Sequence, residues 1–237
     1  MIKLLITRPK KDAVLLAKKI SEMGIATIQQ PVLNVRVVDG PEYDFENAQA
    51  LVTTSTNGIR AFVEQYSQRS LRVLAVGDSS AQEAKKLGFS WVESAGGDVN
   101  DLIKLVRARL SPANGTLIHP AGTKVAGTLY NALREDGFDY KRLVLYEAKK
   151  IIKLNLKTLN FLDRGNIDGV LLFSPRTAEV FETLLVKAKR DFVSSGLDAL
   201  CLSKNVANAL FLDWKSVKVA QKPTQESLLK TVKSCYT

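Results

Sequence analysis

An internal repeat limits the folds open to this chain more than any other feature of its sequence. Residues 50–65 match residues 169–184, since both segments read as an apolar strand, a turn rich in hydroxyls and a helix carrying a phenylalanine. Residues 72–89 match 198–214, and residues 92–110 match 218–236, in the same order and at similar spacing. Three matches in register predict two copies of one domain built from strand–helix units.

The first 30 residues, which read as a strand–helix–strand unit, precede the first copy, and the second copy has no such start of its own. We therefore expect the N-terminal segment to pair with the last third of the chain. The predicted first domain is discontinuous and comprises residues 1–31 and 152–237. Residues 42–141 form an inserted second domain, and residues 32–41 and 142–151 are the linkers between the two.

Strand and helix patterns alternate along the whole chain, which is typical of parallel α/β sheets. The expected strands include 116–119 and 142–146, and the expected helices include 80–87, 123–134 and 204–211. Residues 32–38 and 143–152 alternate between apolar and polar side chains and have charged neighbours. This pattern predicts a two-stranded antiparallel ladder between the domains, which would permit hinge motion.

A polar turn follows six of the expected strands. In a parallel sheet these turns lie at the carboxyl ends of the strands, where ligands bind. Each turn precedes a helix whose first amides have no intrahelical partner and attract anions. We expect six turns on two facing domains to line one cleft. The candidate substrate-binding residues are Arg8, Thr54, Ser55, Thr56, Asn57, Gly58, Gly77, Asp78, Ser79, Gly122, Lys124, Ser174, Pro175, Arg176, Thr177 and Ser203.

Each turn taken alone is also explained as a helix cap. Ser174 followed by Pro175 is a good N-terminal cap, and residues 80–83 (SAQE) fit a capping box. Asp98 is expected to cap the helix that follows it. The interpretation as a ligand site therefore depends on the number of turns and on their common location.

Several kinds of catalytic site are disfavoured by the sequence. The chain has a single histidine, His119, so a histidine-based metal site has no ligand set. His119 closes a strand and could touch a ligand, but we expect it to cap a helix or to be packed. The patterns GxSxG, GxGxxG and the Walker loop are missing. Tyr146 is either a buried structural tyrosine or a phenol that donates a proton in the cleft.

The net charge of +10 indicates attraction to anions, although the basic residues are spread in pairs over expected helix faces. Two distant cysteines, an N-terminus without a leader pattern and no long apolar run lead us to expect a cytoplasmic protein that binds neither membrane nor nucleic acid.

Seven segments resemble, in order, the uroporphyrinogen-III synthase family. They are ITRP (6–9), TSTNGIRAF (54–62), AVGDSSAQEAKKLG (75–88), HPAGTKVAGTLYNALREDGF (119–138), VLYEA (144–148), FSPRTAEVF (173–181) and PTQESLL (223–229). The chain departs from the family at residues 202–207, where LSKNVA replaces a common G-P-T-T-A stretch.

The resemblance implies two flavodoxin-like α/β domains joined by a two-stranded antiparallel β-ladder. It also implies a monomeric, cofactor-free enzyme that closes the linear tetrapyrrole hydroxymethylbilane into uroporphyrinogen III, losing water and inverting ring D. Arg8, Arg60, Lys124 and Arg176 suit a substrate with eight carboxylates. Tyr146 occupies the family's V-Y position and is the candidate for assisting departure of the hydroxyl group.

Two other functions are compatible with the same pattern. A two-lobed binding module that closes on an anionic metabolite would share the fold and the cleft with the synthase. Nucleic-acid binding through the positive charge would require steep salt dependence, and the aromatic-interleaved basic stripe that favours it is missing.

Overall fold

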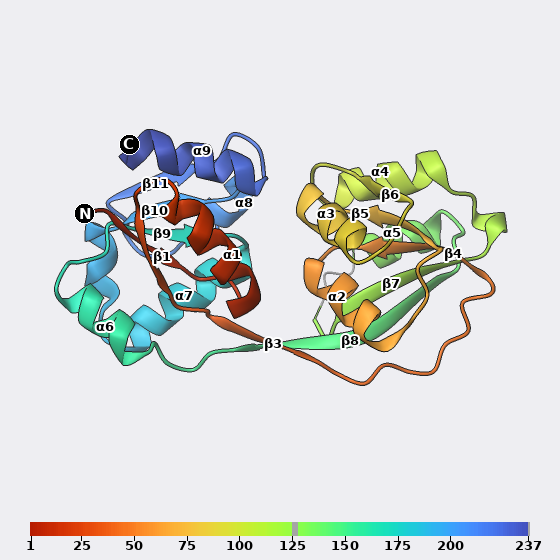
Figure 1. Cartoon of the computed structure of the whole chain (residues 1–237), viewed down its shortest axis with the longest axis horizontal. Coiled ribbons are helices and arrows are strands. Elements are labelled where there is room, and N and C mark those ends of the chain that lie inside the picture. Colours follow the sequence, from red (N-terminus) through yellow and green to blue (C-terminus); the bar gives the residue numbers. More distant parts are fainter. Residues whose placement is uncertain (125–127, 237) are drawn as a thin grey trace. The chain divides into compact units, whose positions relative to one another are not determined.

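The structure is a computed structural model that describes residues 1–124 and 128–236. It divides into two compact units (Figure 1). Unit 1 combines Met1–Asn34 with Lys149–Thr237, and unit 2 is Val35–Ala148. The chain therefore leaves unit 1 once and returns to it once. In Figure 1 both labelled chain ends lie on unit 1.

Unit 1 is built on a parallel sheet with the strand order β11-β10-β9-β1-β2. Its strands are β1 (Lys3–Ile6), β2 (Ala26–Gln29), β9 (Gly169–Leu172), β10 (Asp198–Cys201) and β11 (Ser216–Val219). Its helices are α1 (Lys10–Ser21), α6 (Leu156–Asp163), α7 (Pro175–Lys187), α8 (Lys204–Ala207) and α9 (Gln225–Tyr236), with a 3₁₀ turn η2 (Asp191–Gly196).

The central strands β1, β9 and β10 are buried on both faces, because they are mostly apolar and successive side chains point to opposite faces. Leu5 packs in a cluster with residues of α6, α7 and α8, including Phe181. Leu4 and Ile6 pack in a second cluster with residues of α1 and α9, including Leu16 and Val232. Unit 1 thus has helices on both sides of its sheet.

Unit 2 repeats this arrangement around a sheet with the strand order β3-β8-β7-β4-β5-β6. Its strands are β3 (Leu33–Val37), β4 (Ala48–Thr53), β5 (Arg72–Ala75), β6 (Val92–Ser94), β7 (Thr116–Gly122) and β8 (Tyr140–Lys150). Its helices are α2 (Thr56–Gln65), α3 (Asp78–Lys86), α4 (Val99–Arg109) and α5 (Thr128–Glu135), with a 3₁₀ turn η1 (Pro112–Asn114).

The core of unit 2 also has two faces. Val52 and Leu117 pack with Leu102 of α4 and Leu133 of α5. On the other face, Leu51 and Ile118 belong to a cluster with residues of α2 and α3, which include Phe62. The predicted class, a parallel α/β fold, is confirmed.

The internal repeat corresponds to equivalent positions in the two sheets. The repeat pairs β4 with β9, β5 with β10 and β6 with β11, and these strands occupy the same places in the two strand orders. β7 and β8 then stand where β1 and β2 stand in unit 1. The two units therefore share one arrangement of strands, with the chain entering it at different points.

β3 and β8 contain the two places where the chain passes between the units. The amide of Val38 donates to the carbonyl of Leu145 at 2.9 Å, and the amide of Ile151 donates to the carbonyl of Val32 at 3.0 Å. β3 and β8 are neighbours in the strand order. β8 also pairs with β7 in parallel from Tyr140 to Tyr146, so it is a sheet strand as well as a connection.

Two predicted helices are wrong in extent. α8 ends at Ala207 instead of Phe211, because Leu210, Leu212 and Trp214 leave the helix and pack against the core of unit 1. The helix expected over 123–134 is described from Thr128, since β7 continues to Gly122 and Thr123 lies in a bend. Residues 125–127 of that expectation lie outside the described part of the chain.

Candidate functional site

In each unit the candidate residues gather at the carboxyl ends of three adjacent parallel strands. These strands are β7, β4 and β5 in unit 2 and β10, β9 and β1 in unit 1. In unit 2 the chain passes from β4 to β5, which is one neighbour of β4 in the sheet. It later enters β7, which is the neighbour of β4 on the other side. Such a point, where the strand order reverses, is the usual ligand-binding position of an open α/β sheet.

The turn after β4 is the N-terminal cap of α2. The Ser55 hydroxyl accepts a hydrogen bond from the Asn57 amide at 3.1 Å, as a capping serine should. Thr53 is fully buried, and its hydroxyl donates to the Ser55 carbonyl at 3.0 Å. A Cβ on Gly58 would collide with the carbonyl oxygen of Pro120, so glycine is required for α2 to start this close to β7.

The turn after β5 begins α3 at Asp78, with Gly77 as its cap residue. The predicted capping box at Ser80 is wrong. Ser80 lies inside the first turn of the helix and is buried, and Glu83 is paired with Arg60 instead. Asp78 accepts a hydrogen bond from the Ser94 hydroxyl at 2.7 Å, which ties the turn to β6.

The residues after β7 differ from the other turns because the strand continues through Gly122. A Cβ on Gly122 would lie 2.8 Å from Cε2 of Tyr146 and 2.9 Å from its Cζ, so the tyrosine ring lies directly against this glycine. The Thr123 amide donates to the Tyr146 carbonyl at 3.0 Å, and Arg142 donates to the carbonyls of Gly122 and Thr123. Lys124 is exposed beside them.

His119 lies on β7, three residues before Gly122, and only 2% of its surface is exposed. Its Nε2 lies 3.2 Å from the Thr54 hydroxyl, and its Nδ1 is hydrogen-bonded to the Tyr140 hydroxyl. Burial, together with the positive charge of Arg142, lowers the pKa of His119 to about 4. The imidazole is therefore neutral at physiological pH. The predicted packed position of His119 is confirmed.

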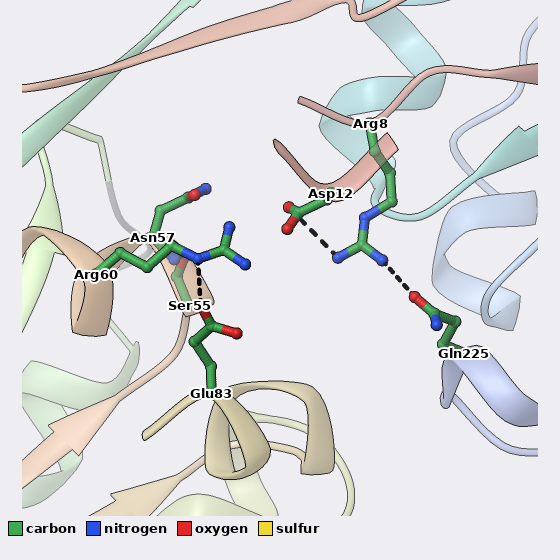
Figure 2. A network of polar contacts seen from close by, with 7 residues as sticks. All are labelled: Arg8, Asp12, Ser55, Asn57, Arg60, Glu83 and Gln225. Atoms are coloured by element: carbon green, nitrogen blue, oxygen red, sulfur yellow. Dashed lines mark hydrogen bonds and ion pairs between the residues drawn. The ribbon is translucent and has the colours of Figure 1, made fainter. Parts of the chain in front are cut away.

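Arg60, one turn into α2, forms an ion pair with Glu83 of α3 (Figure 2). Its Nε lies 2.5 Å from Oε1 of Glu83, and each side chain is 18% exposed. This pair joins the helices that follow β4 and β5 at the end that carries the candidate turns.

In unit 1, Arg8 lies in the turn after β1 and makes several contacts (Figure 2). Its Nη1 donates to Oε1 of Gln225 at 2.8 Å, and its Nη2 lies 3.6 Å from a carboxylate oxygen of Asp12. Its guanidinium stacks 4.5 Å from the centre of the Phe173 ring. Arg8 therefore joins the start of α1 to the start of α9 and to the end of β9.

The turn after β9 is a capping box, as predicted for Ser174. The Thr177 amide donates to the Ser174 hydroxyl at 3.2 Å, and the Ser174 amide donates to the Thr177 hydroxyl at 3.1 Å. Pro175 occupies the first helical position and is exposed, whereas Thr177 is buried. The turn after β10 is weaker, because Ser203 makes no side-chain cap and α8 has four residues.

Two residues of this region were not among the sequence-based candidates. Tyr140 and Arg142 lie on β8 and reach His119 and Gly122 across the sheet. Their spacing of two residues places them on one face of the strand. That signal was present in the sequence, but it did not indicate which strand would be the neighbour of β8.

A cavity of about 610 Å³ lies elsewhere on unit 2 and is lined by residues that include Asp44, Glu46 and Tyr66. Its carboxylates make it a poor site for an anion. Within residues 1–124 and 128–236, no group of three His, Cys, Asp or Glu side chains is placed to hold a metal ion. No helix in the same ranges is long and apolar enough to cross a membrane.

Comparison with known proteins gives one consistent family. The sequence model described as uroporphyrinogen-III synthase HemD matches residues 15–230. A porphyrin biosynthesis protein HemD of Ruminiclostridium josui is 25% identical over 96% of the chain, and the chain spans about half (47%) of that relative's length. A uroporphyrinogen-III synthase of Chlorobaculum parvum is 26% identical over 75% of the chain and 76% of its own length.

Solved structures share the fold. The uroporphyrinogen-III synthetase of Helicobacter pylori has a TM-score of 0.64 at 16% identity and covers 99% of this chain and 100% of its own. A mutant uroporphyrinogen III synthase of Thermus thermophilus has a TM-score of 0.58 at 19% identity, with 99% and 98% covered.

Proposed function

Because the chain belongs to the uroporphyrinogen-III synthase (HemD) family, we propose that it converts hydroxymethylbilane into uroporphyrinogen III. The reaction closes the linear tetrapyrrole, loses one molecule of water and inverts ring D. The observation that carries the proposal, beyond family membership, is the pair of three-turn clusters at the carboxyl ends of adjacent strands.

These clusters suit a substrate with many carboxylates. The amides at the starts of α2, α3 and α7 are hydrogen-bond donors at the positive ends of helix dipoles. Arg8 and Arg60 lie at the same ends of their sheets and add guanidinium donors, each held beside a carboxylate, Asp12 and Glu83 respectively. The proposal treats each cluster as a carboxylate-binding site within its own unit.

The chemistry asks little of the protein beyond positioning. The electron-rich pyrrole expels the hydroxyl group as water when a proton is supplied, which leaves an azafulvene. Ring D then attacks through its substituted carbon and rearranges through a spirocyclic pyrrolenine. Holding the chain ends in the geometry for this attack is catalysis by orientation and electrostatic stabilisation.

We assign assistance of the departing hydroxyl group to Tyr146. Its ring lies against Gly122, its carbonyl accepts a hydrogen bond from the Thr123 amide, and its hydroxyl is a donor of the required kind. The substrate-binding residues of the proposal remain those of the six turns.

We further propose two flavodoxin-like domains, residues 1–31 with 152–237 and residues 42–141, joined by an antiparallel ladder of residues 32–41 and 142–151. The order of unit 1, which reads 2-1-3-4-5 in chain order, supports this description. The proposed enzyme is a cytoplasmic monomer that uses no cofactor. Its unpaired cysteines, Cys201 and Cys235, fit a reducing compartment.

The test supplies enzymatically generated hydroxymethylbilane and resolves the uroporphyrin isomers after oxidation. We expect the type III isomer to dominate. The type I isomer alone, which forms without this enzyme, would exclude the synthase activity. If bilane were still bound in that case, the chain would be a binding module.

A further inference from the structure

We propose that His119 is a positioning residue that fixes the hydroxyl of Thr54 as a hydrogen-bond donor toward a substrate carboxylate. The inference rests on the proposed function, which assigns the turn after β4 to substrate binding. It concerns contacts within unit 2 only.

The imidazole of His119 connects two hydroxyl groups. Nε2 lies 3.2 Å from the Oγ1 of Thr54, and Nδ1 is hydrogen-bonded to the hydroxyl of Tyr140. A neutral imidazole has one N–H donor and one acceptor nitrogen, so the position of its proton sets the direction of both hydrogen bonds. Burial and the positive charge of Arg142 keep this ring neutral.

Tyr140 determines which nitrogen carries the proton. Its side chain is 7% exposed, and in the described ranges the only partner recorded for its hydroxyl is Nδ1 of His119. If Nδ1 carried the proton, the phenolic O–H would be buried without an acceptor, which is costly. The favoured arrangement therefore has Tyr140 donating to Nδ1 and the proton of His119 on Nε2.

This arrangement leaves the Thr54 hydroxyl with its own proton available. Nε2–H donates to Oγ1 of Thr54, which then has an O–H to donate elsewhere. Thr54 is partly exposed at the carboxyl end of β4, whereas the hydroxyl of the neighbouring Thr53 already donates to the Ser55 carbonyl. A chain of hydrogen bonds in one direction, from Tyr140 through His119 to Thr54, also strengthens the last donor. A carboxylate oxygen is the acceptor that such a donor selects.

The tautomer can be observed directly because the chain has one histidine. In protein labelled with ¹⁵N-histidine, two-bond ¹H–¹⁵N spectra distinguish the Nε2–H tautomer, the Nδ1–H tautomer and the imidazolium ion. We expect Nε2–H in the unmodified chain and a raised population of Nδ1–H in Tyr140→Phe. A dominant Nδ1–H form, an imidazolium ion at pH 7, or an unchanged tautomer in Tyr140→Phe would overturn the inference.

Steady-state kinetics test whether the tautomer of His119 affects substrate binding. We expect Tyr140→Phe and Thr54→Val each to raise the KM for hydroxymethylbilane about tenfold with a smaller change in kcat. The KM of the double variant should be little higher than that of either single variant, because both substitutions remove the same donor. Tyr130→Phe is the matched control, since its ring packs 5.5 Å from that of Tyr140 and is half exposed.

Equal effects of the Tyr130 and Tyr140 substitutions on KM, or additive effects in the double variant, would reduce His119 to a packing role. Circular dichroism of each variant verifies folding. If the unmodified chain forms only the type I isomer, the proposed function fails and the role toward substrate fails with it. An Nδ1–H tautomer in a chain that makes the type III isomer overturns the role of His119 alone.

Discussion

Gly122 and Tyr146 are placed by mutual contact, and neither position is explained by its own local sequence. The absence of a side chain at Gly122 makes room for the phenol ring, whose atoms would lie within 3.2 Å of an added Cβ. The neighbouring Thr123 amide holds the Tyr146 carbonyl, so the backbone and the ring of Tyr146 are both fixed here. The Tyr146 ring therefore fits in this position because residue 122 has no Cβ.

Gly122→Ala should lower turnover by displacing the ring of Tyr146. The atoms it would meet are the end of a side chain, so the free energy of unfolding should fall by only about 1 kcal/mol. Formation of the type III isomer and urea denaturation measure the two effects. Tyr146→Phe provides the comparison, because the two variants should slow the reaction to a similar degree. Full activity in Gly122→Ala would show that the ring position is not critical.

His119 should make stability depend on pH. Its pKa is about 4 in the folded chain against 6.5 for an ordinary histidine, so below pH 6.5 the unfolded chain takes up a proton that the folded chain does not. The contribution is complete above pH 6.5 and declines by ~1.4 kcal/mol per pH unit down to about pH 4.

His119→Gln should remove that slope, because glutamine does not titrate. The measurement is the free energy of unfolding from urea titrations at several values between pH 4 and 6.5. The comparison of slopes cancels the carboxyl groups that titrate in both proteins. Identical slopes would contradict a buried neutral histidine.

Among the helices, α7 organises the segment that follows α8. Glu182 of α7 is fully buried, and its carboxylate accepts hydrogen bonds from the amides of Phe211 and Leu212 and from the indole of Trp214 at 2.8–3.0 Å. Three donors on one carboxylate hold this segment in a non-helical form. This contact gives a physical reason why α8 is short.

Glu182→Leu should destabilise unit 1 by about 3 kcal/mol, since it leaves three part-buried donors without an acceptor. The fluorescence of Trp214 should also shift to longer wavelength as its surroundings loosen. Glu179→Leu, an exposed position on the same helix, is the matched control and should change little. Comparable destabilisation by the two substitutions would mean that the three hydrogen bonds contribute little.

At the level of the whole chain, each unit has a core of its own. The two clusters of unit 2 draw on residues between Val37 and Tyr146, and those of unit 1 draw on residues up to Leu33 and from Leu154 onward. Both units bury the two faces of a sheet. Within residues 1–124 and 128–236, none of the four clusters combines residues of both units.

A fragment of residues 35–148 should therefore fold alone and unfold cooperatively in urea, because both faces of its sheet are covered by its own helices. A fragment of residues 1–34 should not fold, because β1 and β2 require β9 as a neighbour and α7 and α9 as cover. A disordered 35–148 fragment, judged by circular dichroism, would show that unit 2 depends on the rest of the chain.

The parallel α/β class, the repeat, and the caps at Ser174 and Asp98 could be predicted because each depends on residues a few positions apart. Apolar runs, hydroxyl side chains and glycines indicate the conformation of the backbone near them in the sequence. The same local reasoning failed at Ser80, because the helix starts at Asp78 and Glu83 is occupied by Arg60, 23 residues away. A capping pattern does not reveal a competing partner that lies on another helix.

By itself, the sequence determined that polar turns follow apolar strands and that one arrangement occurs twice. Only the tertiary structure decided that His119 would join Thr54, 65 residues away, to Tyr140, 21 residues away. The tertiary structure also brought the ring of Tyr146 into contact with Gly122, because β8 pairs with β7. The physical reason is that strand order brings distant residues together through sheet pairing and packing, which local patterns do not encode.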